Sequence, residues 1–167
     1  EYGQYAGHIY ITEGIGDIGA EEIWQTVRDH ILFTGNTPVV VIDYLQIMAP
    51  AEPRATDKQN TDKAVLELKR LSRDSKTPVI AVSSFNRASY QGAVAMEAFK
   101  ESGAIEYSSD VLIGLQFAGT GEDGFDADEA RRKKERKIEL VILKNRNGRT
   151  GDKLGYVYHP LYNLFVE

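Results

Sequence analysis

Cysteine is absent from the 167-residue sequence, and its absence excludes disulfide bonds and any metal or nucleophilic site built on thiolates. Long apolar runs are also missing, since no stretch approaches the roughly 20 residues of a membrane-spanning helix, and no signal peptide is visible. Lys and Arg number 20 against 25 Asp and Glu, so the net charge of -5 argues against a surface that binds nucleic acid everywhere. We therefore expect a cytoplasmic protein with no membrane partner, in which any basic binding site is local.

The residues that are present are typical of a globular domain. Hydrophobic residues make up 42% of the chain and charged residues 27%, and the length suits one domain with its own core. We expect residues 1–167 to form a single domain. The chain begins at Glu1, without a methionine and within a polar segment, so we expect this domain to be partial and N-terminally truncated.

Apolar periodicity predicts alternating strands and helices. Strands are predicted at residues 8–11, 39–42, 78–82, 111–117, 138–143, 153–158 and 161–166. Helices are predicted over residues 20–33 and around Ala64, Leu68 and Leu71, with a loop over 48–61 and partial helix over 91–102. This order predicts an α/β fold with a mainly parallel sheet flanked by helices, whose buried strands are covered on both faces, and with antiparallel C-terminal strands.

Residues 118–137 are expected to form an exposed charged insertion. An acidic block over residues 122–129 runs into the basic sequence RRKKERK at 131–137, so the two halves neutralise each other. The alternative is a nucleic-acid patch, which the adjacent carboxylates would weaken by repelling phosphates.

A glycine-rich segment at residues 14–19 matches G-x-G-x-x-G, the pattern of dinucleotide-binding loops. Four carboxylates would crowd and repel a pyrophosphate at this place: Glu13, Asp17, Glu21 and Glu22. Glu21 and Glu22 are better explained as first-turn residues that complement the dipole of the following helix. We therefore prefer a turn-forming loop and keep a dinucleotide-binding domain as the third hypothesis.

The clearest chemical signal is Asp43, which directly follows the apolar run at residues 39–42. In open parallel sheets the carboxyl ends of the strands form the ligand crevice, and a carboxylate there can hold Mg²⁺ beside nucleotide phosphates. The same position also suits a loop cap, so Asp43 alone leaves both interpretations open. Polar residues that could sense a phosphate or simply form a turn follow the next predicted strand: Ser83, Ser84, Asn86 and Arg87.

Near the other end, VILKNRNGRTG at residues 141–151 carries a predicted strand into a turn. Lys144 and Arg146 are two residues apart, so we expect them to project from one face of the extended chain, and Asn147-Gly148 is a turn signal. Two cations on a rigid strand end suit a phosphate, and an arginine offered to a neighbouring subunit's nucleotide is an arginine finger. The plain alternative is a solvated hairpin end.

Four stretches occur in the order VVVIDYLQIM, LKRLSRDSKTPVIAVSSFNR, FKESGAIEYSSDVLIGL and IELVILKNRNGRTG. Their succession resembles the RecA-like ATPase domain of DnaB-type hexameric replicative DNA helicases, over about residues 8–167. The resemblance implies a motor that hydrolyses ATP with Mg²⁺ at the interfaces of a homo-hexamer, moves along single-stranded DNA and unwinds the duplex. It also implies a bacterial or phage protein with a primase and a helicase loader as partners.

The resemblance assigns roles at the nucleotide. Asp43 matches the Walker B aspartate that holds Mg²⁺, with Gln46 in the same motif. Ser84, Asn86 and Arg87 are the further residues expected at the nucleotide. Ser84 stands where the family usually has a glutamine that couples phosphate state to the DNA loops, and its shorter side chain is expected to couple less well.

The resemblance also assigns a DNA loop and a residue pair that acts across subunits. Lys100 matches the phosphate contact of the loop that grips single-stranded DNA, while Glu101 and Gly103 shape that loop. Lys144 and Arg146 match the pair that reaches the γ-phosphate of the adjacent subunit, which makes them, with the Walker B aspartate, the expected catalytic residues.

One departure concerns the phosphate loop. The sequence has no G-x-x-x-x-G-K-[ST] motif, since no glycine in it is followed by lysine. Without that loop a triphosphate loses its main positioning groups, so we expect the chain alone to be inactive as an ATPase. The competing hypothesis is a catalytically silent RecA-like module used for assembly or partner binding.

Overall fold

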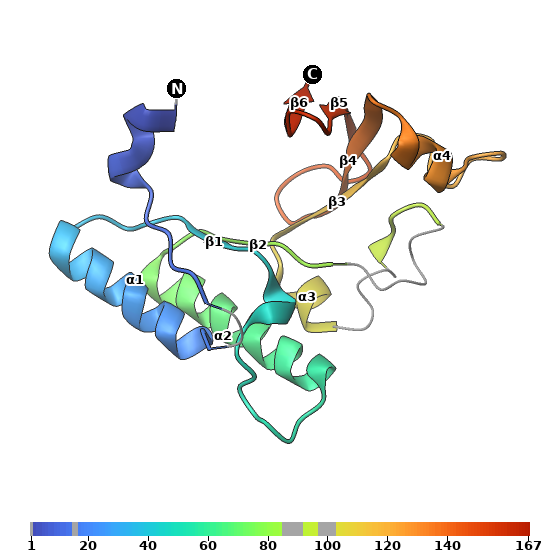
Figure 1. Ribbon diagram of the computed structural model, residues 1–167. Coiled ribbons are helices and arrows are strands. Elements are labelled where there is room, and N and C mark those ends of the chain that lie inside the picture. Colours follow the sequence, from blue (N-terminus) through green and yellow to red (C-terminus); the bar gives the residue numbers. More distant parts are fainter. Residues whose placement is uncertain (1, 15–16, 85–91, 97–102) are drawn as a thin grey trace. The chain divides into compact units, whose positions relative to one another are not determined.

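A computed structural model of the chain describes residues 2–14, 17–84, 92–96 and 103–167 (Figure 1). The chain divides into two compact units, Glu1–Ser83 and Ser84–Glu167. Each unit has its own hydrogen-bonded sheet, a parallel pair in the first and an antiparallel sheet of four strands in the second.

The first unit is built on a two-stranded parallel sheet. Its elements are η1 (Tyr2–His8), α1 (Ala20–Thr34), β1 (Val40–Ile42), η2 (Leu45–Ile47), α2 (Asp57–Ser75) and β2 (Val79–Ala81). Val40 lies opposite Val79 and Ile42 opposite Ala81 in the parallel register. Figure 1 shows α1 and α2 on the same side of this strand pair, so the two helices cover one face of the sheet.

Both long helices begin at capping groups that the sequence supplies. At α1 the backbone N–H of Gly19 donates to Glu22 Oε2 at 2.9 Å, and Gly35 ends the helix in the left-handed conformation with φ 71°. At α2 the N–H of Gln59 donates to Thr56 Oγ1 at 3.3 Å, and the N–H of Thr56 donates to Gln59 Oε1 at 2.9 Å. This reciprocal pair is a capping box, which fixes the start of α2.

The core of the first unit lies between the two helices and the covered face of the sheet. Leu71 is 0% and Leu68 is 4% exposed on α2, and Val27 of α1 is 3% exposed. Fully burying a side chain of this size contributes about 1.5–3 kcal/mol. The predicted apolar positions of the second helix, Ala64 included, are confirmed as core positions.

No described residue covers the other face of the parallel pair fully, and its apolar side chains are exposed. Four apolar residues of these strands and their ends are 47% to 64% exposed: Val39, Val41, Ile80 and Val82. The prediction that both strands are buried on both faces is therefore wrong for this chain, because both helices pack on the same side.

The second unit is an antiparallel sheet with two short helices. Its elements are α3 (Gly103–Ser108), β3 (Val111–Phe117), α4 (Ala127–Arg132), β4 (Arg136–Asn145), β5 (Lys153–His159) and β6 (Leu164–Val166). The strands are ordered β3-β4-β5-β6, each antiparallel to the next. The prediction of antiparallel C-terminal strands is confirmed, and the fold class is mixed α/β.

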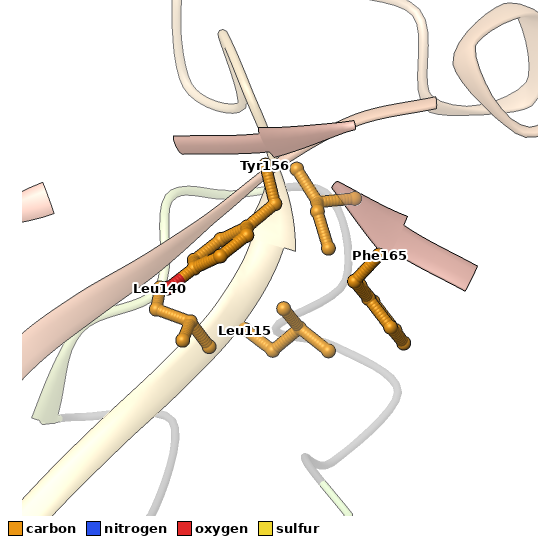
Figure 2. A pocket seen from close by; sticks show the side chains of 5 residues that line it. Leu115, Leu140, Tyr156 and Phe165 are labelled. Carbon is orange, nitrogen blue, oxygen red and sulfur yellow. The ribbon is translucent and has the colours of Figure 1, made fainter. Parts of the chain in front are cut away.

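The two faces of this sheet differ in chemistry. On one face Gln116 and Glu139, each 9% exposed, form a buried polar pair between β3 and β4. On the other face is an open apolar concavity of about 310 Å³, whose lining is seen in Figure 2. Its lining residues are Leu115, Ile138, Leu140, Tyr156 and Phe165.

The segment 118–137 carries α4 between the third and fourth strands. Asp126 caps this helix by accepting hydrogen bonds from the N–H groups of Asp128 and Glu129, at 2.8 and 3.1 Å. Ion pairs then join the acidic and basic blocks, Asp128 with Arg131 at 3.6 Å and Glu129 with Lys133 at 3.1 Å. These contacts support the interpretation of two blocks that neutralise each other.

Several predicted elements differ from the observed ones. Residues 8–11 form no strand, because among the described residues no strand pairs with them, and η1 extends to His8 instead. The loop expected over 48–61 ends at Thr56, where the capping box starts α2. In the expected partial helix over 91–102, residues 91 and 97–102 lie outside the described residues. The parallel pairing in the described residues is limited to β1 and β2.

Candidate functional site

Asp43 directly follows β1, at the carboxyl end of the parallel strand pair. Backbone hydrogen bonds to the neighbouring strand end are made just before and just after Asp43. The Val82 N–H donates to the carbonyl of Ile42, and the Leu45 N–H donates to the carbonyl of Val82, both at 2.9 Å. Leu45 is 5% exposed and anchors η2 beneath this edge. The strand end therefore holds the backbone of Asp43 while its side chain remains exposed.

The exposure of Asp43 changes one part of the sequence argument. A buried carboxylate would need a compensating partner, but an exposed one carries little desolvation cost. Its presence after an apolar strand is thus compatible with a ligand site without any internal ion pair. In open α/β sheets ligands bind at the carboxyl ends of the parallel strands, and the side chain of Asp43 is exposed at such an end.

Gln46 and Ser83 connect the ends of the two parallel strands. Gln46 Nε2 donates a hydrogen bond to Ser83 Oγ at 2.9 Å. Gln46 belongs to η2 after β1, and Ser83 follows β2, so the bond links the carboxyl ends of both strands. Asp43 therefore lies at an edge that also carries an amide and a hydroxyl, which are groups that can bind a phosphate or orient a water.

The remaining predicted nucleotide residues belong to the segment after β2. Ser84 is exposed and directly follows Ser83. Asn86 and Arg87 lie outside the described residues. Their roles stay predictions.

Lys144 and Arg146 lie at the end of β4, in the second unit. Lys144 is half-buried and donates from Nζ to the carbonyl of Glu106 at 2.5 Å. Arg146 is in the turn after the strand; its backbone N–H donates to the carbonyl of Asp110 at 2.9 Å, and its Nη1 lies 3.1 Å from Asp110 Oδ1. The two predicted phosphate-binding cations are therefore both held by the segment that runs from α3 to the start of β3, Lys144 by Glu106 within α3 and Arg146 by Asp110 after it.

The predicted DNA loop is described only at its last residue. Gly103 is the first residue of α3. Lys100 and Glu101 lie outside the described residues, so their roles stay predictions.

Sequence reasoning missed Glu106 and Asp110 as partners of the cationic pair. Both depend on the antiparallel register, in which Leu112 lies opposite Lys144 and the register shifts between residues 112 and 113. A β-bulge of this kind re-aims the side chains next to it. The available signal was an acidic residue directly before a predicted strand, but the sequence alone does not give the strand pairing.

The described residues can be compared with the ligands that Mg²⁺ and a nucleotide need. No group of three or more His, Cys, Asp or Glu side chains that could hold a metal occurs in the described ranges. Mg²⁺ bound with a nucleotide needs only one or two carboxylates beside the phosphates, so the exposed Asp43 fits such a site. A glycine-rich phosphate loop is missing from this sequence, in which no glycine is followed by lysine.

Two other places are poor candidates for a nucleotide. The concavity in Figure 2 is lined by apolar side chains with one phenol, from Tyr156, and offers no charged group to a phosphate. At the glycine-rich segment, the Gly19 N–H that a pyrophosphate would need is already bonded to the carboxylate of Glu22. The expectation that this carboxylate serves the first turn of the helix is confirmed.

Comparison with known proteins assigns the family. A family model described as "DnaB-like helicase C terminal domain" matches residues 5–167. The chain belongs to the DnaB-like helicase C-terminal domain family. Its predicted resemblance to DnaB-type replicative helicases is therefore confirmed.

Several replicative DNA helicases are related in sequence. DnaB of Leifsonia xyli subsp. xyli (strain CTCB07) is 30% identical over 132 residues, which cover 77% of this chain and 27% of that protein. DnaB of Geobacillus stearothermophilus is 32% identical over 137 residues, with 77% and 28% covered. The replicative DNA helicase DnaC of Bacillus subtilis (strain 168) is 32% identical over 133 residues, with the same coverage of 77% and 28%. The chain thus spans a little over a quarter of each relative's length.

Solved structures support a DnaB-like fold. A DnaB-like replicative helicase, described with its interactions with primase, matches with a TM-score of 0.81 at 24% identity, covering 99% of this chain and 39% of that one. A second solved structure, of an ATPase domain, matches with a TM-score of 0.75 at 24% identity, covering 90% and 51%. Within the described ranges, every helix is too short or too polar to traverse a lipid bilayer.

Proposed function

We propose that this chain is part of the RecA-like motor of an ATP-dependent replicative DNA helicase. In this proposal ATP is hydrolysed between the subunits of a homo-hexamer, and hydrolysis drives movement along single-stranded DNA and unwinding of the duplex. The observation that carries the proposal is the exposed carboxylate of Asp43 at the carboxyl end of a parallel strand, beside the bond between Gln46 and Ser83.

At the nucleotide, Asp43 is the ligand that this chain offers to Mg²⁺. A bound Mg²⁺ neutralises charge on the β- and γ-phosphates. Gln46 is held by Ser83 at the adjacent strand end, which suits an amide that orients the attacking water or senses the γ-phosphate. Ser84, Asn86 and Arg87 follow on the same segment and are proposed to complete the polar edge.

Across the subunit interface, Lys144 and Arg146 are proposed to reach the γ-phosphate of the neighbouring subunit. Their place at a strand end supports this role, because a rigid strand positions a cation better than a free loop does. Lys100 is proposed to contact the phosphates of single-stranded DNA, with Glu101 and Gly103 shaping its loop. A primase and a helicase loader are proposed partners of the whole bacterial or phage protein.

The test is an ATPase measurement on the full-length gene product with the substitution Asp43→Asn. Losing the Mg²⁺ ligand should lower kcat by about 100-fold or more, since a metal contributes several kcal/mol to the transition state. Asp29→Asn, which neutralises a half-buried carboxylate on α1 that accepts a hydrogen bond from Gln25, is the matched control and should leave the rate unchanged. Equal rates for Asp43→Asn and the wild type, with Mg²⁺ present, contradict the proposal.

A catalytically silent RecA-like module is the second candidate, and the lack of a phosphate loop in this sequence favours it. The two candidates differ in the wild-type gene product, which hydrolyses ATP under the first and does not under the second. A filter-binding assay with ATP and Mg²⁺ on the same preparation separates a silent module that still binds nucleotide from one that does not.

A further inference from the structure

The end of β4 and the segment from α3 to β3 make three contacts. Lys144 Nζ donates to the carbonyl of Glu106, the Arg146 N–H donates to the carbonyl of Asp110, and Arg146 Nη1 pairs with Asp110 Oδ1. The register shift between residues 112 and 113 immediately precedes this point, so β4 enters the turn with an extra residue relative to its partner strand. Both cations therefore end on the same neighbouring segment.

The Lys144 contact lies at the carboxyl-terminal end of a helix. Glu106 is the fourth residue of the six-residue α3, so its carbonyl is among the last four of the helix, which have no partner within it. The same carbonyl also accepts from Ser109 Oγ at 3.4 Å. A cation at this end of a helix is favoured by the helix dipole, and Lys144 therefore stabilises α3 as well as its own position.

The Arg146 contact is exposed and easily exchanged. The side chain of Arg146 is 55% exposed and that of Asp110 is 53% exposed. Ion pairs this exposed are weak and are screened by salt, so a multiply charged phosphate competes with the carboxylate for the guanidinium. The pair can orient Arg146 without preventing it from binding another anion.

The helix that Lys144 contacts begins at a residue of the predicted DNA loop. α3 starts at Gly103, the last residue of the segment 100–103 that is proposed to bind DNA. The same short helix thus connects the residues proposed for DNA and the carbonyl that receives Lys144. Gly103 and Glu106 are only three residues apart in this helix.

We propose that Asp110 and the Glu106 carbonyl are positioning groups that hold Lys144 and Arg146 in a resting arrangement and tie them to α3. A phosphate that binds the two cations displaces these contacts and releases the end of α3 from β4. This inference rests on the proposed function and adds to it the residues that link the phosphate-binding pair to the segment proposed to bind DNA.

The first test does not depend on catalysis. Hydrogen exchange of the backbone amides at residues 103–108 is measured in the full-length gene product, with and without inorganic tripolyphosphate as the probe. Tripolyphosphate should speed exchange in α3 of the wild type about two- to fivefold, the range that an exposed ion pair carries. Lys144→Met should raise exchange without the probe and remove the response to it. Unchanged exchange in both experiments overturns the inference, whether or not the protein is an ATPase.

The second test measures coupling in the ATPase reaction. Asp110→Asn frees Arg146 from its resting partner, so the rate without DNA should rise about two- to fivefold and the stimulation by single-stranded DNA should fall. Asp110→Glu keeps the carboxylate and should restore the wild-type ratio of the ATPase rate with single-stranded DNA to the rate without it. Asp128→Asn, which breaks an exposed pair with Arg131 in α4, should leave this ratio unchanged. A purely structural role predicts instead that Asp110→Asn lowers both rates in proportion, and that result overturns the inference.

Failure of the proposed function gives a different pattern. If the wild-type protein has no ATPase activity but tripolyphosphate still changes hydrogen exchange in α3, the proposed motor function is contradicted. The inference that phosphate displaces the contacts of Lys144 and Arg146 is then supported. If the protein is an active ATPase but hydrogen exchange in α3 does not respond to tripolyphosphate, the proposed motor function is supported and the inference about these contacts is contradicted.

Discussion

Gln116 and Glu139 lie directly opposite each other on β3 and β4, and Gln116 Nε2 donates a hydrogen bond to Glu139 Oε1 at 2.5 Å. Lys153 of β5 donates to the same carboxylate oxygen at 2.8 Å, and Gln116 Oε1 accepts from the N–H of Val94 at 2.6 Å. Burial alone raises the pKa of Glu139, but the hydrogen bonds from Lys153 and Gln116 and the charge of Lys153 outweigh it and hold the pKa below its ordinary value.

The lowered pKa predicts that Glu139 stabilises the second unit at neutral pH and less so in acid. A carboxyl whose folded-state pKa is depressed contributes stability above its unfolded pKa, about 4.3, and that contribution is lost as pH falls through the folded-state value. Glu139→Gln should lower the free energy of unfolding at pH 7 by about 1–3 kcal/mol, because the charged hydrogen bonds to Lys153 and Gln116 lose strength. Chemical denaturation at pH 7 and at pH 3 measures the difference.

The control for this experiment is Glu129→Gln in α4. Glu129 pairs with Lys133, and the two side chains are 70% and 59% exposed, so its loss should change the stability little at either pH. A destabilisation by Glu139→Gln that is as large in acid as at pH 7 would mean that the shape of the side chain matters and its charge does not.

The core of the first unit depends on α2. Leu71 is fully buried, so Leu71→Ala should lower the free energy of unfolding by about 2–5 kcal/mol through lost burial and the cavity left behind. Leu66 lies on the same helix and is 49% exposed, and Leu66→Ala should cost less than about 1 kcal/mol. Urea denaturation followed by circular dichroism measures both. Equal effects would contradict the packing of α2 on the sheet described above.

The start of α2 depends on its capping box. Thr56→Ala removes the oxygen that accepts from the Gln59 N–H and should cost about 0.5–2 kcal/mol. Thr26→Ala is the matched control, because Thr26 lies inside α1 and its hydroxyl only donates to the carbonyl of Glu22. Alanine has the higher helix propensity, so this control should be neutral or slightly stabilising. Thermal melts measure the stability of both variants. A loss of stability in Thr26→Ala equal to that in Thr56→Ala would exclude capping as the cause.

The sequence predicted elements whose signal is local and missed those that need a partner. The helix over residues 20–33 follows from its apolar period and the glycine after it, and the observed helix is α1. Residues 8–11 have strand-forming side chains, but a strand also needs a neighbour, and no described strand pairs with them. The open face of β1 and β2 was missed for a similar reason, since an apolar run does not tell how many helices cover it or on which side.

In the candidate site, too, the residues with a local sequence signal were predicted and those that depend on strand pairing were missed. Asp43 was singled out because a carboxylate after an apolar run is visible in the sequence. The structure places it directly after β1, and its role at a nucleotide stays a prediction. The partners of Lys144 and Arg146 were not found, because they depend on a bulge in the antiparallel register. The pair of Gln116 and Glu139 also depends on register, although a glutamate inside the apolar run at 138–143 was a signal for it.

The proposed DNA contact predicts a binding phenotype. In the full-length gene product, Lys100→Ala should weaken binding of single-stranded DNA by a similar factor for all sequences, because a phosphate contact reads no bases. The slope of log affinity against log salt should fall by about 0.7 to 1, the value for one phosphate contact. Lys133→Ala in the charged insertion should leave the slope unchanged, since that lysine is paired with Glu129. Fluorescence anisotropy over a salt series measures both, and a change at Lys133 alone would favour the insertion as the nucleic-acid patch.

Arg146 provides the test of catalysis across subunits. If its guanidinium stabilises the γ-phosphate of the neighbouring subunit, Arg146→Ala should lower kcat of the full-length gene product about a thousandfold or more while ATP binding largely survives. In rings mixed from Arg146→Ala and Asp43→Asn subunits, which are each inactive alone, activity should reappear, because the intact Asp43 of one subunit then meets the intact Arg146 of its neighbour. Arg149→Ala, which removes an exposed arginine three residues further along, is the control and should leave kcat near the wild-type value. No activity in these mixed rings would place the action of Arg146 within its own subunit.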